Sequence, residues 1–114
     1  MIYGFLMDEL IGNLHARYHD DVKEMITMQD YERVFSTHFC KQNDDRDKRI
    51  CVMRYKYGLS FSKIGKMVNL TPTRIKCITA VMIHRLIQYL LWVSFERKKA
   101  DEIFNNYRYF RYQF

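Results

Sequence analysis

The chain has 114 residues, with one proline and four glycines. This length suits one domain whose core needs neither disulfide nor metal support, and so few turn residues favour long helices over a sheet of many strands. Residues 1–45 hold four Lys/Arg against nine Asp/Glu, whereas residues 46–114 hold fifteen against four, a net charge of +11 in the second part. The basic part therefore favours a polyanionic partner, and a surface charge that only aids solubility is the alternative.

The cysteines indicate a reducing compartment. Cys40, Cys51 and Cys77 form no Cys-x-x-Cys pattern and are odd in number, and no signal peptide is visible. The most apolar run, residues 86–95, is too short to span a bilayer. We therefore expect a cytoplasmic protein without a membrane partner, associated with the nucleoid if it binds DNA.

Two helices are predicted in the acidic part. Residues 2–17 place apolar side chains at helical spacing: Ile2, Phe5, Leu6, Leu10 and Leu14. A second helix is expected over residues 20–41, with Asp20 and Asp21 at its positive end, although the period is blurred around residues 27–31. Its expected buried face is Val22, Met25, Ile26, Met28, Val34, Phe35 and Phe39. The acidic surface can be a solvated face, a site for a basic partner or a mask over the basic part.

Two short helices follow. Residues 46–56 predict a third helix that ends at Gly58 in the left-handed conformation, with Ile50, Met53 and Tyr57 pointing inward. Ser60 is the expected cap of a fourth helix, whose buried stripe is Phe61, Ile64, Met67 and Val68. Gly65 in its middle costs roughly 1 kcal/mol of helix propensity relative to alanine. Such a glycine usually lets a neighbouring helix approach.

A long helix is expected after a turn at Asn69 and Leu70. Thr71 is its predicted cap and Pro72 fits its first position. The inward residues are Ile75, Ile78, Met82 and Leu86, and the helix is expected to continue, straight or bent near Ser94, to about residue 106. Residues 86–95 are apolar nearly all round, which requires cover on more than one side. We expect the first two helices to give this cover; a homo-oligomer formed through residues 86–114 is the alternative.

The tail, residues 104–114, interleaves aromatic residues with Arg108 and Arg111. Such a tail can stack on unpaired bases, or dock into a groove of a partner. It can also fold back over Trp92.

Residues 46–86 together predict a helix-turn-helix, which lays its second helix in the major groove of DNA. They carry Tyr-Gly-Leu at 57–59, Ile-Gly-Lys at 64–66, Asn-Leu-Thr at 69–71 and Arg-Ile-Lys at 74–76. In this order the motifs resemble region 4 of bacterial housekeeping sigma factors. The resemblance implies recognition of a promoter element by the second helix and docking on the flap of RNA polymerase.

The chain departs from that family where bases are read. Pro72 and Thr73 stand where the family has an arginine-glutamate pair, Cys77 replaces a base-reading glutamine, and Thr79 replaces a glutamate. The family's usual promoter sequence is therefore not expected. Nothing outside residues 46–86 resembles the promoter-melting regions, which favours an isolated module of the compact kind that phages encode.

The expected DNA contacts fall into two sets. The base-facing residues lie on the outward arc of residues 72–80 and are Thr73, Arg74, Lys76, Cys77, Thr79 and Ala80. The phosphate contacts are Arg54, Lys56, Lys63, Lys66 and Thr71. Arg74 can bind guanine bidentately, which is worth about 1–3 kcal/mol of discrimination, whereas the lysines position the protein without reading sequence. For each lysine alone, a solvated helix face is the alternative.

Other chemistry is weakly represented. His15 and His19 lie four residues apart beside Asp20, but no third metal ligand accompanies them at a recognisable spacing. Neither Cys51 nor Cys77 has a histidine and an acid at a spacing that would make it a nucleophile. We therefore expect no metal, no cofactor and no enzymatic activity.

The sequence thus predicts an all-α single domain of five or six helices with a central helix-turn-helix and a long C-terminal helix. Its parts are the acidic helices of 1–45, the helix-turn-helix of 46–86 and the apolar helix and tail of 87–114. The leading hypothesis is a sequence-specific, DNA-binding transcription factor that also contacts RNA polymerase. The alternatives are a module that binds RNA polymerase or a sigma partner without reading DNA, and an oligomeric repressor or DNA-packaging protein.

Overall fold

The computed structural model describes residues 1–17, 26–41 and 45–113, and the side chains of all of these except 45 and 98–113. The described part contains helices and no strand. Its elements are α1 (Gly4–Arg17), α3 (Met28–Val34), the π-helix η1 (Phe35–Phe39), α4 (Asp45–Tyr55), α5 (Phe61–Val68) and α6 (Pro72–Gln113). The all-α, single-domain prediction is confirmed.

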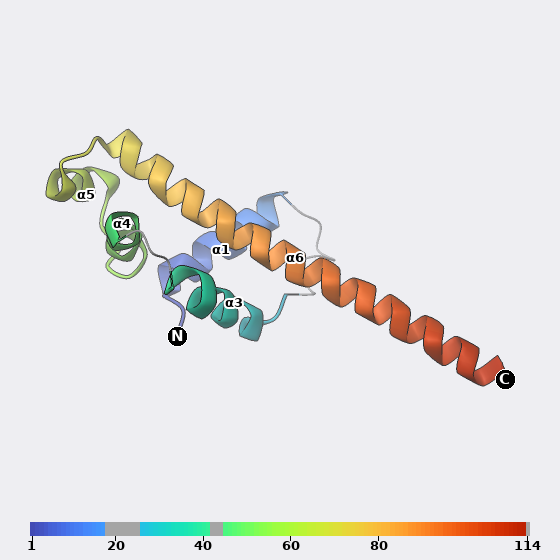
Figure 1. The fold of residues 1–114 in the computed structure, drawn as a ribbon. Coiled ribbons are helices and arrows are strands. Elements are labelled where there is room, and N and C mark those ends of the chain that lie inside the picture. Colours follow the sequence, from blue (N-terminus) through green and yellow to red (C-terminus); the bar gives the residue numbers. More distant parts are fainter. Residues whose placement is uncertain (18–25, 42–44, 114) are drawn as a thin grey trace.

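Helix α6 is the axis of the molecule. Its 42 residues span about 63 Å at the usual rise per residue, close to the longest dimension of 68 Å. Helices α4 and α5 lie at its N-terminal end, α1 and α3 lie beside its middle, and its C-terminal end extends past all of them (Figure 1). One helix therefore joins the helix-turn-helix to the rest of the fold.

The main core packs α1, α3, η1 and α4 against the middle of α6. Leu6, Leu10 and Leu14 form the inner face of α1 and are almost fully buried. The other buried members are Ile26, Tyr31, Val34, Phe35, Phe39, Cys51, Tyr55, Met82, Ile83, Leu86, Ile87, Leu90 and Leu91. Tyr3 adds edge-to-face ring contacts to Phe35 and Phe39, with centroids 4.8 and 5.8 Å away.

The prediction of one helix over residues 20–41 is wrong at its start, since α3 begins at Met28. Thr27 is extended and caps α3 through a capping box with Asp30, in which each side chain binds the other residue's backbone N–H. An N-cap residue needs non-helical backbone angles, so no single helix crosses this point. Asp20 and Asp21 lie outside the described residues.

An ion pair between a buried carboxylate and a half-buried guanidinium ties α3 to α6. Arg97 donates to both carboxylate oxygens of Asp30, at 2.7 and 2.9 Å. Because the Arg97 guanidinium hydrogen-bonds the ionised form, it lowers the pKa of Asp30 to about 2. The pair joins residues 67 positions apart.

Four apolar side chains that were expected inside are exposed: Phe5, Met28, Tyr57 and Met67. Tyr57 lies beyond the last turn of α4, where Gly58 at φ +67° turns the chain away, and Cys51 and Tyr55 take the buried face instead. On α5, Val68 rather than Met67 is half-buried, and it packs against a cluster of four buried isoleucines: Ile50, Ile64, Ile75 and Ile78.

The expected intramolecular cover of residues 86–95 is incomplete. Leu86, Ile87, Leu90 and Leu91 are buried as expected. On the opposite side of α6, three large aromatic side chains stay exposed: Tyr89, Trp92 and Phe95. The tail does not fold back over Trp92, because α6 runs without interruption to Gln113 and away from the other helices (Figure 1).

By length and composition, the segment Pro72–Arg97 is apolar enough to cross a membrane, but half of its most apolar window is buried inside the protein. Core helices of water-soluble proteins share this property, so the composition alone is weak evidence for a membrane span. The absence of a membrane partner stays a prediction.

Candidate nucleic-acid interface

The turn between α5 and α6 is shaped by local signals. Ser60 caps α5 by accepting from the N–H of Lys63 at 3.1 Å. Asn69 ends the helix in the left-handed conformation, at φ 59° and ψ 47°, which asparagine tolerates better than most residues. The N–H of Leu70 then donates to the carbonyl of Gly65 at 2.9 Å.

Gly65 permits this close turn. A Cβ at this position would collide with the carbonyl oxygen of Leu70. The glycine therefore makes room for the backbone of the turn, rather than for a neighbouring helix as the sequence suggested. The result is a short connection that sets the direction of α6.

The start of α6 agrees with the prediction. Pro72 is its first residue, and the Thr71 hydroxyl accepts from the N–H of Arg74 at 3.2 Å. A second, smaller core holds this end of α6 against α4 and α5; we call it the HTH core, and its buried members are Ile50, Ile64, Ile75 and Ile78. The positions 75 and 78 were correctly predicted to face inward.

Five of the six predicted base-facing residues share the exposed arc at the start of α6: Thr73, Arg74, Lys76, Cys77 and Ala80. The prediction for Thr79 is wrong. Its side chain is only 3 % exposed, donates to the carbonyl of Lys76 at 3.0 Å and hydrogen-bonds the hydroxyl of Tyr55. Thr79 thus joins α6 to α4 and cannot reach a base.

The predicted phosphate contacts differ in their exposure to solvent. Lys56, Lys63, Lys66 and Thr71 are exposed. Arg54 is half-buried, donates to the carbonyl of Leu59 at 3.0 Å and lies 4.1 Å from the ring centroid of Phe61. These contacts make Arg54 a brace of the α4–α5 loop, so it is less available to a phosphate than the lysines are.

The charge around the arc is of one sign. Residues 48–95 contain no Asp or Glu, and their nine cations are Lys48, Arg49, Arg54, Lys56, Lys63, Lys66, Arg74, Lys76 and Arg85. Acidic side chains can approach this segment only from other parts of the fold.

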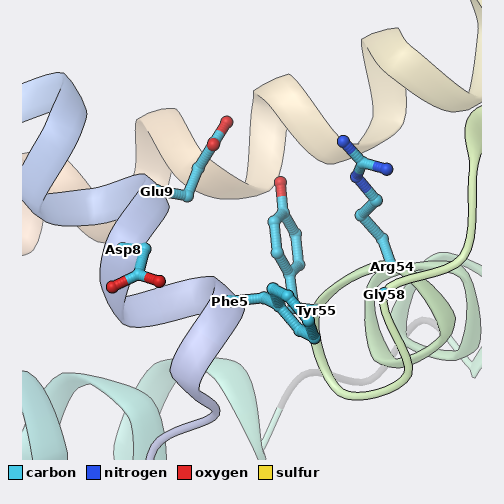
Figure 2. A pocket seen from close by; sticks show the side chains of 6 residues that line it. All are labelled: Phe5, Asp8, Glu9, Arg54, Tyr55 and Gly58. Carbon is cyan, nitrogen blue, oxygen red and sulfur yellow. The ribbon is translucent and has the colours of Figure 1, made fainter.

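One such approach comes from α1. The sequence suggested a mask over the basic part as one alternative but did not indicate which acidic residues would lie near it. A cavity of about 330 Å³ lies between α1 and α4, lined by Phe5, Asp8, Glu9, Arg54, Tyr55 and Gly58. Figure 2 shows Asp8 and Glu9 on α1, across the cavity from Tyr55 and Arg54 on α4. The acidic part of the chain therefore meets the basic part at the edge of the helix-turn-helix, on the side of α1. Glu9 also lines a smaller pocket with Ala80 at the end of the arc, whereas Thr73, Arg74, Lys76 and Cys77 are exposed.

A second hollow lies between α4 and α5. It has a volume of about 670 Å³ and is lined by Arg46, Lys48, Arg49, Val52, Met53, Met67 and Val68. Its floor is apolar and its rim is cationic. We call it the α4–α5 groove.

The described residues hold no group of three His, Cys, Asp or Glu side chains that could bind a metal. His15 is exposed on α1, and its expected companions His19 and Asp20 lie outside the described part. His38 instead stacks on the ring of Tyr89, with centroids 3.5 Å apart.

The three cysteines differ in environment. Cys40 and Cys77 are exposed and Cys51 is buried. Burial raises the pKa of the Cys51 thiol to about 12, so it is not a nucleophile at neutral pH.

Comparison with protein-family models, with curated proteins and with solved structures finds no match to this chain.

Proposed function

We propose that the protein binds double-stranded DNA by placing residues 72–80 of α6 in the major groove, and that it regulates transcription. The observation on which this depends is the exposed cationic arc at the beginning of α6, held outward by the HTH core. A helix that begins at an exposed surface with basic side chains on its leading face is the element that helix-turn-helix proteins insert into DNA.

The start of α6 offers two kinds of contact. Pro72 has no N–H and the N–H of Arg74 is bound by the Thr71 hydroxyl. In the first turn this leaves the N–H of Thr73 to attract a phosphate, a preference that the helix dipole strengthens. Arg74 and Lys76 are exposed beside Thr73 and Cys77, so the arc combines charged donors with small side chains that permit close approach. Arg74 is the residue best suited to read a guanine.

The lysines of α5 would position the complex. Lys63 and Lys66 are exposed one helical turn apart, on the helix that crosses the phosphate backbone in this motif. Binding that depends on such contacts weakens steeply as salt rises.

An electrophoretic shift assay tests the proposal. We expect Arg74→Ala with Lys76→Ala to abolish a DNA complex that the wild type forms at low salt. The matched control is Arg33→Ala with Lys41→Ala, which removes the same charge from exposed positions outside the helix-turn-helix and should leave most of the affinity. Unchanged retardation by the α6 double variant would remove the role assigned to the arc.

The α4–α5 groove favours a second candidate function, in which the module binds RNA polymerase or a sigma partner without reading DNA. A cationic rim over an apolar floor fits an acidic amphipathic segment of a partner protein. The departures from the base-reading residues of the sigma family point the same way.

Met67→Glu separates the two functions. Met67 is 61 % exposed on the groove, so the change puts a charge on the floor without disturbing a core. If the groove is the functional surface, the variant loses RNA polymerase in a pull-down assay and the wild type shows no DNA affinity at low salt.

A further inference from the structure

A stripe of four exposed residues runs along one side of α6. Arg85, Tyr89, Trp92 and Glu96 are all exposed, and their spacing of four, three and four residues places them on one face of a helix. We call them the α6 stripe. Phe95 lies beside it and is 62 % exposed.

The aromatic area of this face is of the size that an interface needs. Tyr89, Trp92 and Phe95 are 43, 64 and 62 % exposed, so together these residues present on the order of 400 Å² of surface to solvent. A stable interface buries roughly 800 Å² on each partner, of which a little over half is apolar. The patch supplies about this apolar share.

The same face carries both a ridge and a hollow. Next to Trp92, between α6 and the α3–η1 segment, lies a groove of about 580 Å³ lined by Arg33, Val34, Thr37, His38, Gln88, Tyr89, Trp92 and Val93. The stacked ring of His38 supports Tyr89. A face with a protruding ring and an adjacent groove can complement a copy of itself, which is the requirement of a two-fold interface.

The charges at the two ends of the α6 stripe decide whether two stripes can pair in parallel or antiparallel. The α6 stripe has a cation at one end and an anion at the other, and neither Arg85 nor Glu96 forms an ion pair with any residue of the described part. Two parallel stripes would place like charges together, whereas two antiparallel stripes place each charge opposite its counterpart.

We propose that two copies of the chain associate through antiparallel α6 stripes, with the two-fold axis midway between Tyr89 and Trp92. Tyr89 then faces Trp92 of the second copy, and Arg85 faces Glu96 of the second copy, because the members of each pair are equally distant from the midpoint. This interface goes beyond DNA binding and does not depend on it. The two recognition arcs would lie about 45 Å apart at the usual helical rise, which exceeds one turn of DNA and favours bridging of separate sites.

Charge exchange tests the arrangement, with mass measured by sedimentation equilibrium at low salt. The wild type should approach twice its monomer mass of 14.0 kDa at tens of micromolar. Arg85→Glu and Glu96→Arg should each raise the dimer dissociation constant about tenfold or more, since each turns two attractive pairs into repulsive ones. The double variant, and an equimolar mixture of the two single variants, should return to the wild-type value, because both restore opposite charges across an antiparallel pair.

Two further variants complete the test. Trp92→Ala should raise the dissociation constant about a hundredfold, as expected for an aromatic anchor that is present twice. Arg74→Glu makes the same charge change at the far end of α6 and should leave the mass unchanged; circular dichroism confirms that each variant is folded. A monomeric wild type at 100 micromolar, or single charge variants that dimerise like the wild type, would overturn the proposal.

Discussion

The main core and the HTH core lie on the same helix but are built differently. The main core has sixteen buried apolar residues, Ile26 before α3 and fifteen from α1, α3, η1, α4 and α6. The Asp30–Arg97 pair closes its far end. The HTH core has four buried isoleucines and half-buried neighbours. Because the HTH core is small and both cores share α6, the position of the arc also depends on the anchorage of α6 in the main core.

This difference predicts separate responses to damage. A change in the main core should lower the stability of the whole protein, whereas a change in the HTH core should first open α5 and the turn, since regions with fewer buried contacts unfold at lower cost.

The largest effect is expected from Leu90→Ala. Leu90 is fully buried in the main core, and removing such a side chain leaves a cavity that costs about 2–5 kcal/mol. We expect the free energy of unfolding, measured by urea denaturation, to fall by about 3 kcal/mol. Val81→Ala, at a position that is 52 % exposed on the same helix, should change it by less than about 0.5 kcal/mol. Equal effects of the two changes would contradict the described core.

Gly65→Ala should destabilise the HTH core although alanine is the better helix former. The propensity gain is about 1 kcal/mol, but the added Cβ would meet the carbonyl oxygen of Leu70, and we expect a net loss of about 2 kcal/mol. Hydrogen exchange should show the loss of protection in α5 and the start of α6 but not in α1. The control is Gly12→Ala, at an exposed position of α1 with nothing within 4 Å of the new Cβ, and this change should stabilise the protein. If Gly65→Ala stabilised the protein as well, the close approach of Leu70 to Gly65 would be ruled out.

Acid should weaken the main core through Asp30. The pKa of Asp30 is about 2 in the folded protein and 3.8 for an unpaired carboxyl. Ionised Asp30 therefore stabilises the fold above about pH 4, and this contribution is lost as the pH falls toward 2. The expected loss is up to about 2 kcal/mol. Urea denaturation at several pH values measures it. Asp30→Asn should be less stable at neutral pH and should lack this part of the acid dependence; the same acid sensitivity in both proteins would assign it to other groups.

The smallest expected effect is on the reactivity of the cysteine thiols and not on stability. A thiol reagent should label Cys40 and Cys77 in the native protein and spare Cys51, which is buried and has a pKa raised to about 12. If the arc binds DNA, a saturating duplex should slow the labelling of Cys77 severalfold while Cys40 reacts as before. Mass spectrometry of the labelled protein distinguishes the sites, and equal protection of the two cysteines would argue against the arc.

Local signals made the helix-turn-helix readable. Ser60, Thr71 and Pro72 cap or begin their helices as predicted, and Gly58 has the expected positive φ. Each of these preferences involves a residue and its neighbours within one turn, so it can be recognised without knowledge of the fold.

The sequence-based predictions were wrong where the burial of a side chain depends on which distant residue packs against it. Thr79 was expected to face DNA because the helical period alone does not reveal Tyr55 on α4. The blurred period around residues 27–31 was not recognised as a helix start, because seven apolar residues over 20–41 suggested one continuous face. The capping box of Thr27 with Asp30 ends that continuity.

The sequence by itself determined the helical class, the long final helix, the capped turn and the concentration of positive charge, because propensity, capping and net charge are properties of neighbouring residues. Only the tertiary structure decided which side chains of α6 are covered, that Asp30 binds Arg97 across 67 positions, and that α1 brings Asp8 and Glu9 to the edge of the helix-turn-helix. These are contacts between distant parts of the chain, and their choice rests on how the helices pack together.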